Sequence, residues 1–170
     1  MMIKKYISPF VCGFSAGVLQ IVPVAKSFAC CLIIPVAAYF SLLLDQKANK
    51  DYSRITVKKA ITFGILTGLN AALFGTLFEV IITLITKNND LVSALPEVQK
   101  MLVNFPIDPH LKKEVLALLN GVIYSIKHYG FSFIYSFSIL MNNLIINTLF
   151  GLIGGLIAMQ IINKKNSAGI

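Results

Sequence analysis

The feature that most restricts the fold of this chain is an apolar run from Ala60 to Thr86. An apolar run of more than about 18 residues is typical of a transmembrane helix, because about 20 helical residues cross the hydrocarbon core of a bilayer. The run contains one ionisable residue, Glu79. A carboxylate is costly inside a membrane, so we expect Glu79 either to be paired with a neighbouring group or to be functional.

Three further apolar segments accompany this run, and the chain is 56% hydrophobic and only 13% charged. Soluble domains carry about 25% charged residues, so the composition favours a membrane protein. Pro23 is expected to end or bend the first segment, and Pro35 to kink the second. We therefore predict an all-α membrane protein that forms a single domain over residues 1–170. The predicted transmembrane helices cover residues 7–24, 27–44, 60–86 and 131–162.

Residues 91–130, between the third and fourth apolar segments, are the longest polar-containing region. Asp108 followed by Pro109 is a typical helix start, and Gly130 is a typical stop. Between them, apolar residues recur at helical spacing, which predicts an external amphipathic helix. Such a helix either lies on the bilayer surface or packs on the end of the bundle. Its apolar face consists of Leu111, Val115, Leu118, Leu119, Val122, Ile123 and Ile126.

The distribution of basic residues predicts the orientation. The net charge is +8, and most Lys and Arg residues flank apolar segments. Cytoplasmic loops are enriched in Lys and Arg, so both termini and the loop between the second and third segments are predicted to be cytoplasmic. We expect a bacterial inner-membrane protein whose basic residues face lipid head groups, with no nucleic-acid partner. The predicted cytoplasmic group is Lys4, Lys5, Lys47, Lys50, Arg54, Lys58, Lys59, Lys164 and Lys165.

Small residues form stripes on three of the predicted helices. Residues three or four apart lie on one helical face, and small side chains let another helix approach closely. Such stripes predict close helix packing, within one chain or between chains. The glycines of these stripes are Gly13, Gly17, Gly64, Gly68, Gly75, Gly151 and Gly154.

One polar constellation within the apolar segments is a candidate site. From Lys59 to Glu79, and from Asn163 back to Asn143, the helix rise is about 30 Å in each case. Asn147 and Gln20 come out at similar depth and also lie on small-residue faces. We therefore predict an intramembrane polar cluster of Glu79, Asn143, Asn147 and Gln20. It serves either as a proton or cation relay or polar substrate site, or as interhelical hydrogen bonding with a structural role.

Enzymatic chemistry has little support in the sequence. The three cysteines lie within apolar segments, and His110 and His128 match no metal-binding spacing. The glycines near residue 151 lie inside an apolar helix, which is unlike a phosphate-binding loop. We expect no catalytic residues, no cofactor and no metal.

The last segment ends in the run from Phe150 to Lys165, FGLIGGLIAMQIINKK. This glycine-rich apolar ending and the overall plan resemble a group of uncharacterised small bacterial four-helix integral membrane proteins, a domain of unknown function. The resemblance implies four membrane helices with a long region between the third and fourth. It implies no known activity and no site residues.

Three functional hypotheses follow from these patterns. The small-residue stripes favour a non-enzymatic inner-membrane protein that acts through helix–helix contacts, as a homo-oligomer or as an accessory subunit of a membrane complex. The alternative is a small proton- or ion-linked transporter or channel that uses Glu79. A third hypothesis is a lipid-surface module that acts through the helix from Asp108 to Gly130.

Overall fold

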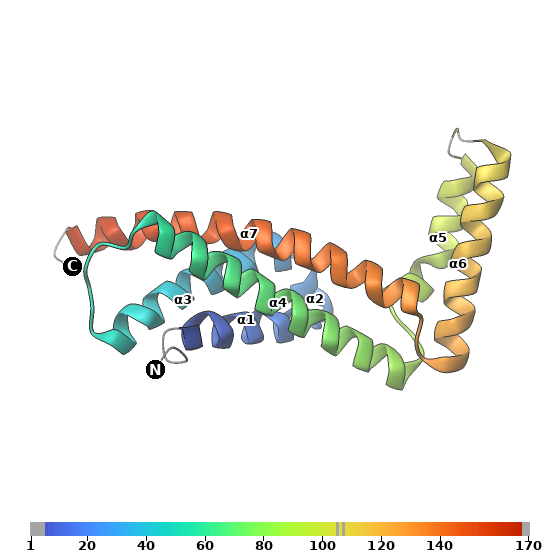
Figure 1. Cartoon of the computed structure of the whole chain (residues 1–170). Helices are drawn as coiled ribbons and strands as arrows, with labels where there is room; N and C mark the ends of the chain where they lie inside the picture. Colours follow the sequence, from blue (N-terminus) through green and yellow to red (C-terminus); the bar gives the residue numbers. More distant parts are fainter. Residues whose placement is uncertain (1–5, 105, 107, 168–170) are drawn as a thin grey trace. The chain divides into compact units, whose positions relative to one another are not determined.

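The computed structural model describes residues 6–104, 106 and 108–167. Within this described part every regular element is helical, which confirms the predicted all-α class (Figure 1). The elements in chain order are α1 (Ile7–Leu19), α2 (Pro23–Lys26), the π-helical segment η2 (Ala29–Ile33), α3 (Ile34–Asn49), α4 (Val57–Thr86), α5 (Asp90–Asn104), α6 (Pro109–Tyr129) and α7 (Phe133–Ser167).

Among the described residues, three helical stretches are long and apolar enough to cross a membrane: Cys31–Asn49, Val57–Thr86 and Phe133–Ser167. They fall in the second, third and fourth predicted segments. The first predicted segment, residues 7–24, contains α1, a shorter apolar helix of 13 residues. At 1.5 Å per residue it is about 20 Å long, less than the ~30 Å hydrocarbon core. It ends early because the chain turns before Pro23, which begins α2.

The chain forms two compact units. Unit 1 comprises Met1–Phe78 and Ile139–Ile170, and unit 2 comprises Glu79–Ser138. Helices α4 and α7 each contribute residues to both units. Unit 1 therefore contains α1, α2, η2 and α3 together with most of α4 and α7, whereas unit 2 contains α5 and α6 with the end of α4 and the start of α7.

The glycine stripes of unit 1 pack against one another within the single chain. A Cβ atom added to Gly64 would collide with the backbone of Gly151, and one added to Gly68 would collide with the backbone of Asn147. A Cβ at Gly17 would lie 2.9 Å from the amide nitrogen of Gly75. Real side chains do not approach a backbone so closely. The glycines therefore permit α4 to contact both α7 and α1 at backbone distance.

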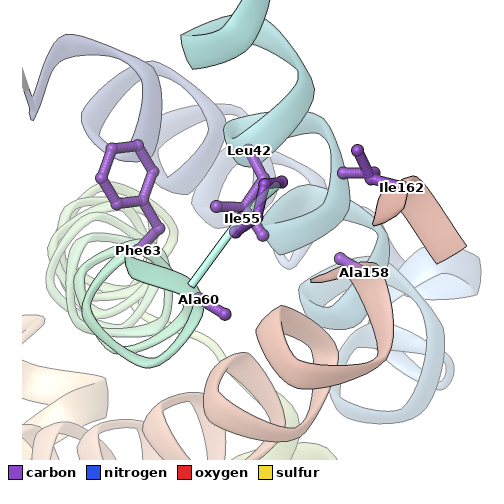
Figure 2. Close-up of a cluster of buried hydrophobic side chains, with 6 residues drawn as sticks. All are labelled: Leu42, Ile55, Ala60, Phe63, Ala158 and Ile162. Atoms are coloured by element: carbon purple, nitrogen blue, oxygen red, sulfur yellow. The ribbon is translucent and has the colours of Figure 1, made fainter. Parts of the chain in front are cut away.

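A buried apolar cluster in unit 1 lies where α3, the α3–α4 loop, α4 and α7 meet, as Figure 2 shows. Phe63 is the largest of them and is 1% exposed, and the Lys59 ammonium lies 5.8 Å from the centre of its ring. The cluster consists of Leu42, Ile55, Ala60, Phe63, Ala158 and Ile162.

The helix predicted to begin at Asp108 and end at Gly130 is confirmed as α6 in unit 2. The Asp108 carboxylate accepts a hydrogen bond from the His110 amide at 2.7 Å, which caps the first turn. Gly130 has φ +71°, and its amide donates to the Ile126 carbonyl at 2.8 Å. This left-handed conformation suits glycine and ends the helix. A side chain at Gly130 would also collide with the backbone of Leu84 at the end of α4.

Candidate functional site

Glu79 lies in the part of α4 that belongs to unit 2, and its carboxylate has a tyrosine partner. The hydroxyl of Tyr135 in α7 donates a hydrogen bond to Glu79 Oε1 at 2.9 Å. A hydroxyl donor to a carboxylate makes a charge-assisted hydrogen bond, which is stronger than a neutral one. Glu79 was expected to be either paired or functional, and the structure shows it paired with Tyr135, which the sequence pattern did not single out as its partner.

Asn147 and Gln20 are joined directly in unit 1. Asn147 in α7 is 3% exposed, and its Nδ2 donates to Gln20 Oε1 at 3.2 Å. Gln20 follows the last turn of α1, and its side chain lies over Gly75 of α4, where an added Cβ would be 2.9 Å from Gln20 Oε1. This pair therefore links α1 with α7 in a place that only a glycine of α4 leaves open.

Asn143 makes the third polar contact, also in unit 1. Its Nδ2 donates to the Thr76 hydroxyl at 3.0 Å, which connects α7 to α4. The four residues of the predicted cluster thus belong to three hydrogen-bonded pairs, two of them in unit 1 and one in unit 2. Hydrogen bonds of this kind between membrane helices are worth about 0.6 kcal/mol on average.

The register between α4 and α7 explains these partners. Placing Glu79 level with Asn143 assumes that Lys59 and Asn163 lie level at the ends of their helices. In the structure Asn163 instead hydrogen-bonds to Ile55, four residues before Lys59. The glycine contacts in unit 1, Gly64 with Gly151 and Gly68 with Asn147, follow the same shifted register. The partners of Glu79 and Asn143 are therefore displaced by about one to two helical turns from the depth estimate, whereas Asn147 and Gln20, which it placed at similar depth, do pair.

Three buried polar atoms around the Asn147–Gln20 pair have no hydrogen-bond partner: Gln20 Nε2, Thr67 Oγ1 and Thr148 Oγ1. Thr67 is fully buried and directly precedes Gly68, which contacts the Asn147 backbone. A buried polar group without a partner costs about 1–3 kcal/mol. The Asn147–Gln20 pair is thus accompanied by unpaired buried polar atoms on α4, on α7 and on the residue that follows α1.

A second polar group, which the sequence analysis did not predict, surrounds Asp45 at the end of α3. The Asp45 side chain is 3% exposed and lies 2.6 Å from the Lys59 ammonium of α4. Its Oδ1 also accepts a hydrogen bond from Asn49 Nδ2 at 3.0 Å. The only sequence signal was the position of Asp45 at the border between an apolar segment and a basic loop. Burial of the carboxylate depends on the approach of α4 to α3.

The α3–α4 loop is held by side-chain amides from α3 and α7. Gln46 Nε2 donates to the Ser53 carbonyl at 3.0 Å, and Asn166 Nδ2 donates to the Tyr52 carbonyl at 3.0 Å. Asn163 hydrogen-bonds to both the amide and the carbonyl of Ile55. These amides replace the water that would otherwise bind the loop backbone, so they order the predicted cytoplasmic loop.

The part of the chain that the structure describes contains no group of three or more His, Cys, Asp or Glu side chains that could hold a metal ion. Within the same part the side chain of Cys12 is buried and that of Cys31 is exposed.

Comparison of the chain with models of known protein families, with characterised proteins and with solved structures finds no match in any of the three.

Proposed function

We propose that the chain is a non-enzymatic integral protein of a bacterial inner membrane, with both termini in the cytoplasm, that acts as a homo-oligomer through a helix contact made by α6. Three helices long and apolar enough to cross a membrane support insertion. The basic residues around the α3–α4 loop and after α7 support the orientation. In this topology residues 91–130 lie on the external side.

The proposal rests on a difference in packing between Gly121 and the stripe glycines of unit 1. In unit 1 the stripe glycines that favoured oligomerisation are already covered by other helices of the same chain. Among the glycines of the described residues, Gly121 on α6 is the one at which an added Cβ would meet nothing within 4 Å. Glycine in the middle of a helix costs about 0.5–1 kcal/mol relative to alanine, so an open one is unexplained by packing within the chain.

The surface around Gly121 has the shape of a helix-docking groove. Ala117, Gly121 and Ser125 recur every fourth residue and form a small-residue stripe on one face of α6. They line a groove of about 520 Å³ whose walls include Leu118 and Ile134. Leu118 is 63% exposed beside this groove, so a helix that enters the groove can cover it.

A second copy of the chain is the occupant that this face fits. Two copies of one helix face pack against each other through a twofold axis, the commonest symmetry of homo-oligomers. Small residues at the crossing point allow the two α6 backbones to approach closely, while Leu118 of each copy covers apolar surface of the other. The stripe is short, so a single helix crossing is sufficient to use it.

The oligomeric state in lipid nanodiscs tests the proposal. We expect the purified protein to be dimeric, Gly121→Leu to be monomeric because it fills the groove, and Asn120→Leu to stay dimeric. Asn120 is the matched control because it is exposed on α6 but lies about 100° around the helix from Gly121. A monomeric wild type, or a Gly121→Leu variant that remains dimeric, would contradict the proposal.

The Glu79–Tyr135 hydrogen bond favours a second candidate, a proton-linked transport function. A carboxylate in a candidate membrane helix that is bonded to a hydroxyl group can take up and release a proton as its surroundings change. Under this hypothesis Glu79→Gln abolishes pH-dependent ion flux in liposomes, and Tyr135→Phe changes its pH profile. If Glu79 is structural, Glu79→Gln is tolerated, because glutamine still accepts the hydrogen bond from Tyr135.

A further inference from the structure

An apolar groove in unit 1 runs between α1 on one side and η2 and α3 on the other. It has a volume of about 450 Å³, within the ~300–1,000 Å³ range of ligand sites. Its floor is made of small, buried side chains: Cys12 is 7% exposed and Ala16 is 1% exposed. Its walls are large apolar side chains that remain about half exposed, such as Leu32 and Phe40. A small-residue floor between bulky walls produces a channel along the helices.

The lining of the groove selects a hydrocarbon occupant. Ser15 carries the hydroxyl group among the lining residues, and that hydroxyl already donates to the Val11 carbonyl at 2.9 Å. A polar ligand would have to be desolvated without finding new partners along this lining, which is unfavourable. An alkyl chain has no hydrogen bonds to water to lose in the same place, and it covers the apolar walls.

The length of the groove corresponds to one leaflet of a bilayer. Its residues on η2 and α3 extend from Leu32 to Leu44, and twelve helical steps correspond to about 18 Å. One leaflet contributes about half of the ~30 Å hydrocarbon core. A single acyl chain that lies along α3 therefore fills the groove from end to end.

A basic residue stands where the head group of such a lipid would lie. Lys47 is exposed and follows Leu44 by three residues, so it continues the face of α3 that Val36, Phe40 and Leu44 present to the groove. The neighbouring carboxylate of Asp45 is buried and paired with Lys59, so its negative charge is compensated. In the proposed topology this end faces the cytoplasmic leaflet, which is rich in anionic lipids.

We propose that the α1–α3 groove binds one acyl chain of an anionic phospholipid from the cytoplasmic leaflet, with the lipid phosphate at Lys47. The inference rests on the membrane insertion proposed above, but not on the α6 contact. It assigns α1 a role that a helix too short to span the bilayer can perform, namely to form one wall of a lipid site.

The chain contains no tryptophan, which allows a single fluorescent reporter to test the site. Phe40→Trp places the reporter in the groove wall, and Leu149→Trp on α7 is the matched control because both native side chains are about half exposed, at 51% and 53%. Each variant is reconstituted into phosphatidylcholine vesicles that contain a small fraction of brominated phosphatidylglycerol or, separately, brominated phosphatidylcholine. Bromine quenches tryptophan only at close range.

We expect the groove tryptophan to prefer the anionic lipid by about fivefold, the effect of one lysine near the head group. Lys47→Gln in this background removes the preference, whereas Lys164→Gln, at another predicted cytoplasmic lysine, preserves it. The control tryptophan on α7 responds equally to both lipids. Equal quenching of the groove tryptophan, or its complete protection by a covering protein helix, would overturn the lipid site.

A second variant tests the lipid site independently, and an extraction control distinguishes failure of the lipid site from failure of membrane insertion. Ala37→Leu fills the groove, so native mass spectrometry should detect several-fold less retained phospholipid than on the wild type. Unchanged retention would also overturn the site. Alkaline carbonate extraction of native membranes reports insertion independently: release of the protein would refute membrane insertion itself, and the lipid site with it, whereas an inserted protein without lipid preference refutes the site alone.

Discussion

Asn163 binds both backbone hydrogen-bonding groups of Ile55 with one side chain. Its Oδ1 accepts from the Ile55 amide at 2.8 Å, and its Nδ2 donates to the Ile55 carbonyl at 3.0 Å. The two residues are far apart in sequence, so this amide joins α7 to the loop that precedes α4. Ile55 is 3% exposed and belongs to the buried cluster of unit 1, so its backbone would lack water if the amide were removed.

Replacement of Asn163 should therefore destabilise the protein. Asn163→Ala removes two hydrogen bonds, and at about 0.5–1.5 kcal/mol each we expect a loss of about 1–3 kcal/mol in the free energy of unfolding. Denaturant unfolding in mild detergent, followed by circular dichroism, measures the change. Asn166→Ala is the control, because it removes one exposed bond to Tyr52 and should cost less. Equal losses in the free energy of unfolding for the two substitutions would contradict a larger contribution from the double contact with Ile55.

The Asp45–Lys59 pair should show strong coupling between its partners. Asp45→Asn removes the charge that compensates Lys59, and loss of one partner of a fully buried pair costs about 3–5 kcal/mol. We expect about 1–3 kcal/mol here, because the Lys59 side chain is 30% exposed and water screens its charge. A double-mutant cycle with Lys59→Met measures the coupling. Additive effects of the two substitutions would mean that the pair contributes nothing to folding.

Two glycine substitutions should act in opposite directions. Gly68→Ala places a Cβ against the Asn147 backbone and should separate α4 from α7, with a clear loss of thermal stability in detergent. In the detergent-solubilised monomer, Gly121→Ala adds a methyl group in open space within a helix and should stabilise by up to about 1 kcal/mol. Both variants keep the residue small, so the comparison isolates the packing around each site. Destabilisation by Gly121→Ala in the monomer would contradict the open environment of this residue.

The loop residue Asp51 should titrate below its ordinary range. Hydrogen bonds from the Ser53 hydroxyl and amide favour the ionised carboxylate and lower the pKa of Asp51. A lowered pKa in the folded state means that the stabilising effect is present above the unfolded pKa of about 3.9 and is lost as the pH falls through the folded pKa. NMR of the Asp51 carboxyl carbon gives the midpoint, and a Ser53→Ala variant should move it upward. A midpoint at or above 3.9 in the wild type would exclude this arrangement.

Local features of the sequence predicted most of the helices correctly. Long apolar runs are sufficient to indicate helices such as α4 and α7, because a helix satisfies its own backbone hydrogen bonds without reference to distant residues. The start at Asp108 and the stop at Gly130 depend on cap and turn chemistry within a few residues. Pro23 carried the signal that the first segment is interrupted, but length alone favoured a longer helix there.

What only the tertiary structure decided is the alignment of one helix against another. The contacts of Gly64 with Gly151 and of Gly68 with Asn147 set the register of α4 and α7 in unit 1, and no periodicity within either helix specifies that register. For the same reason the sequence could place Glu79 on a small-residue face but could not select Tyr135 as its partner. Side-chain spacing determines which residues share a face, whereas close backbone packing determines which faces meet and at what height.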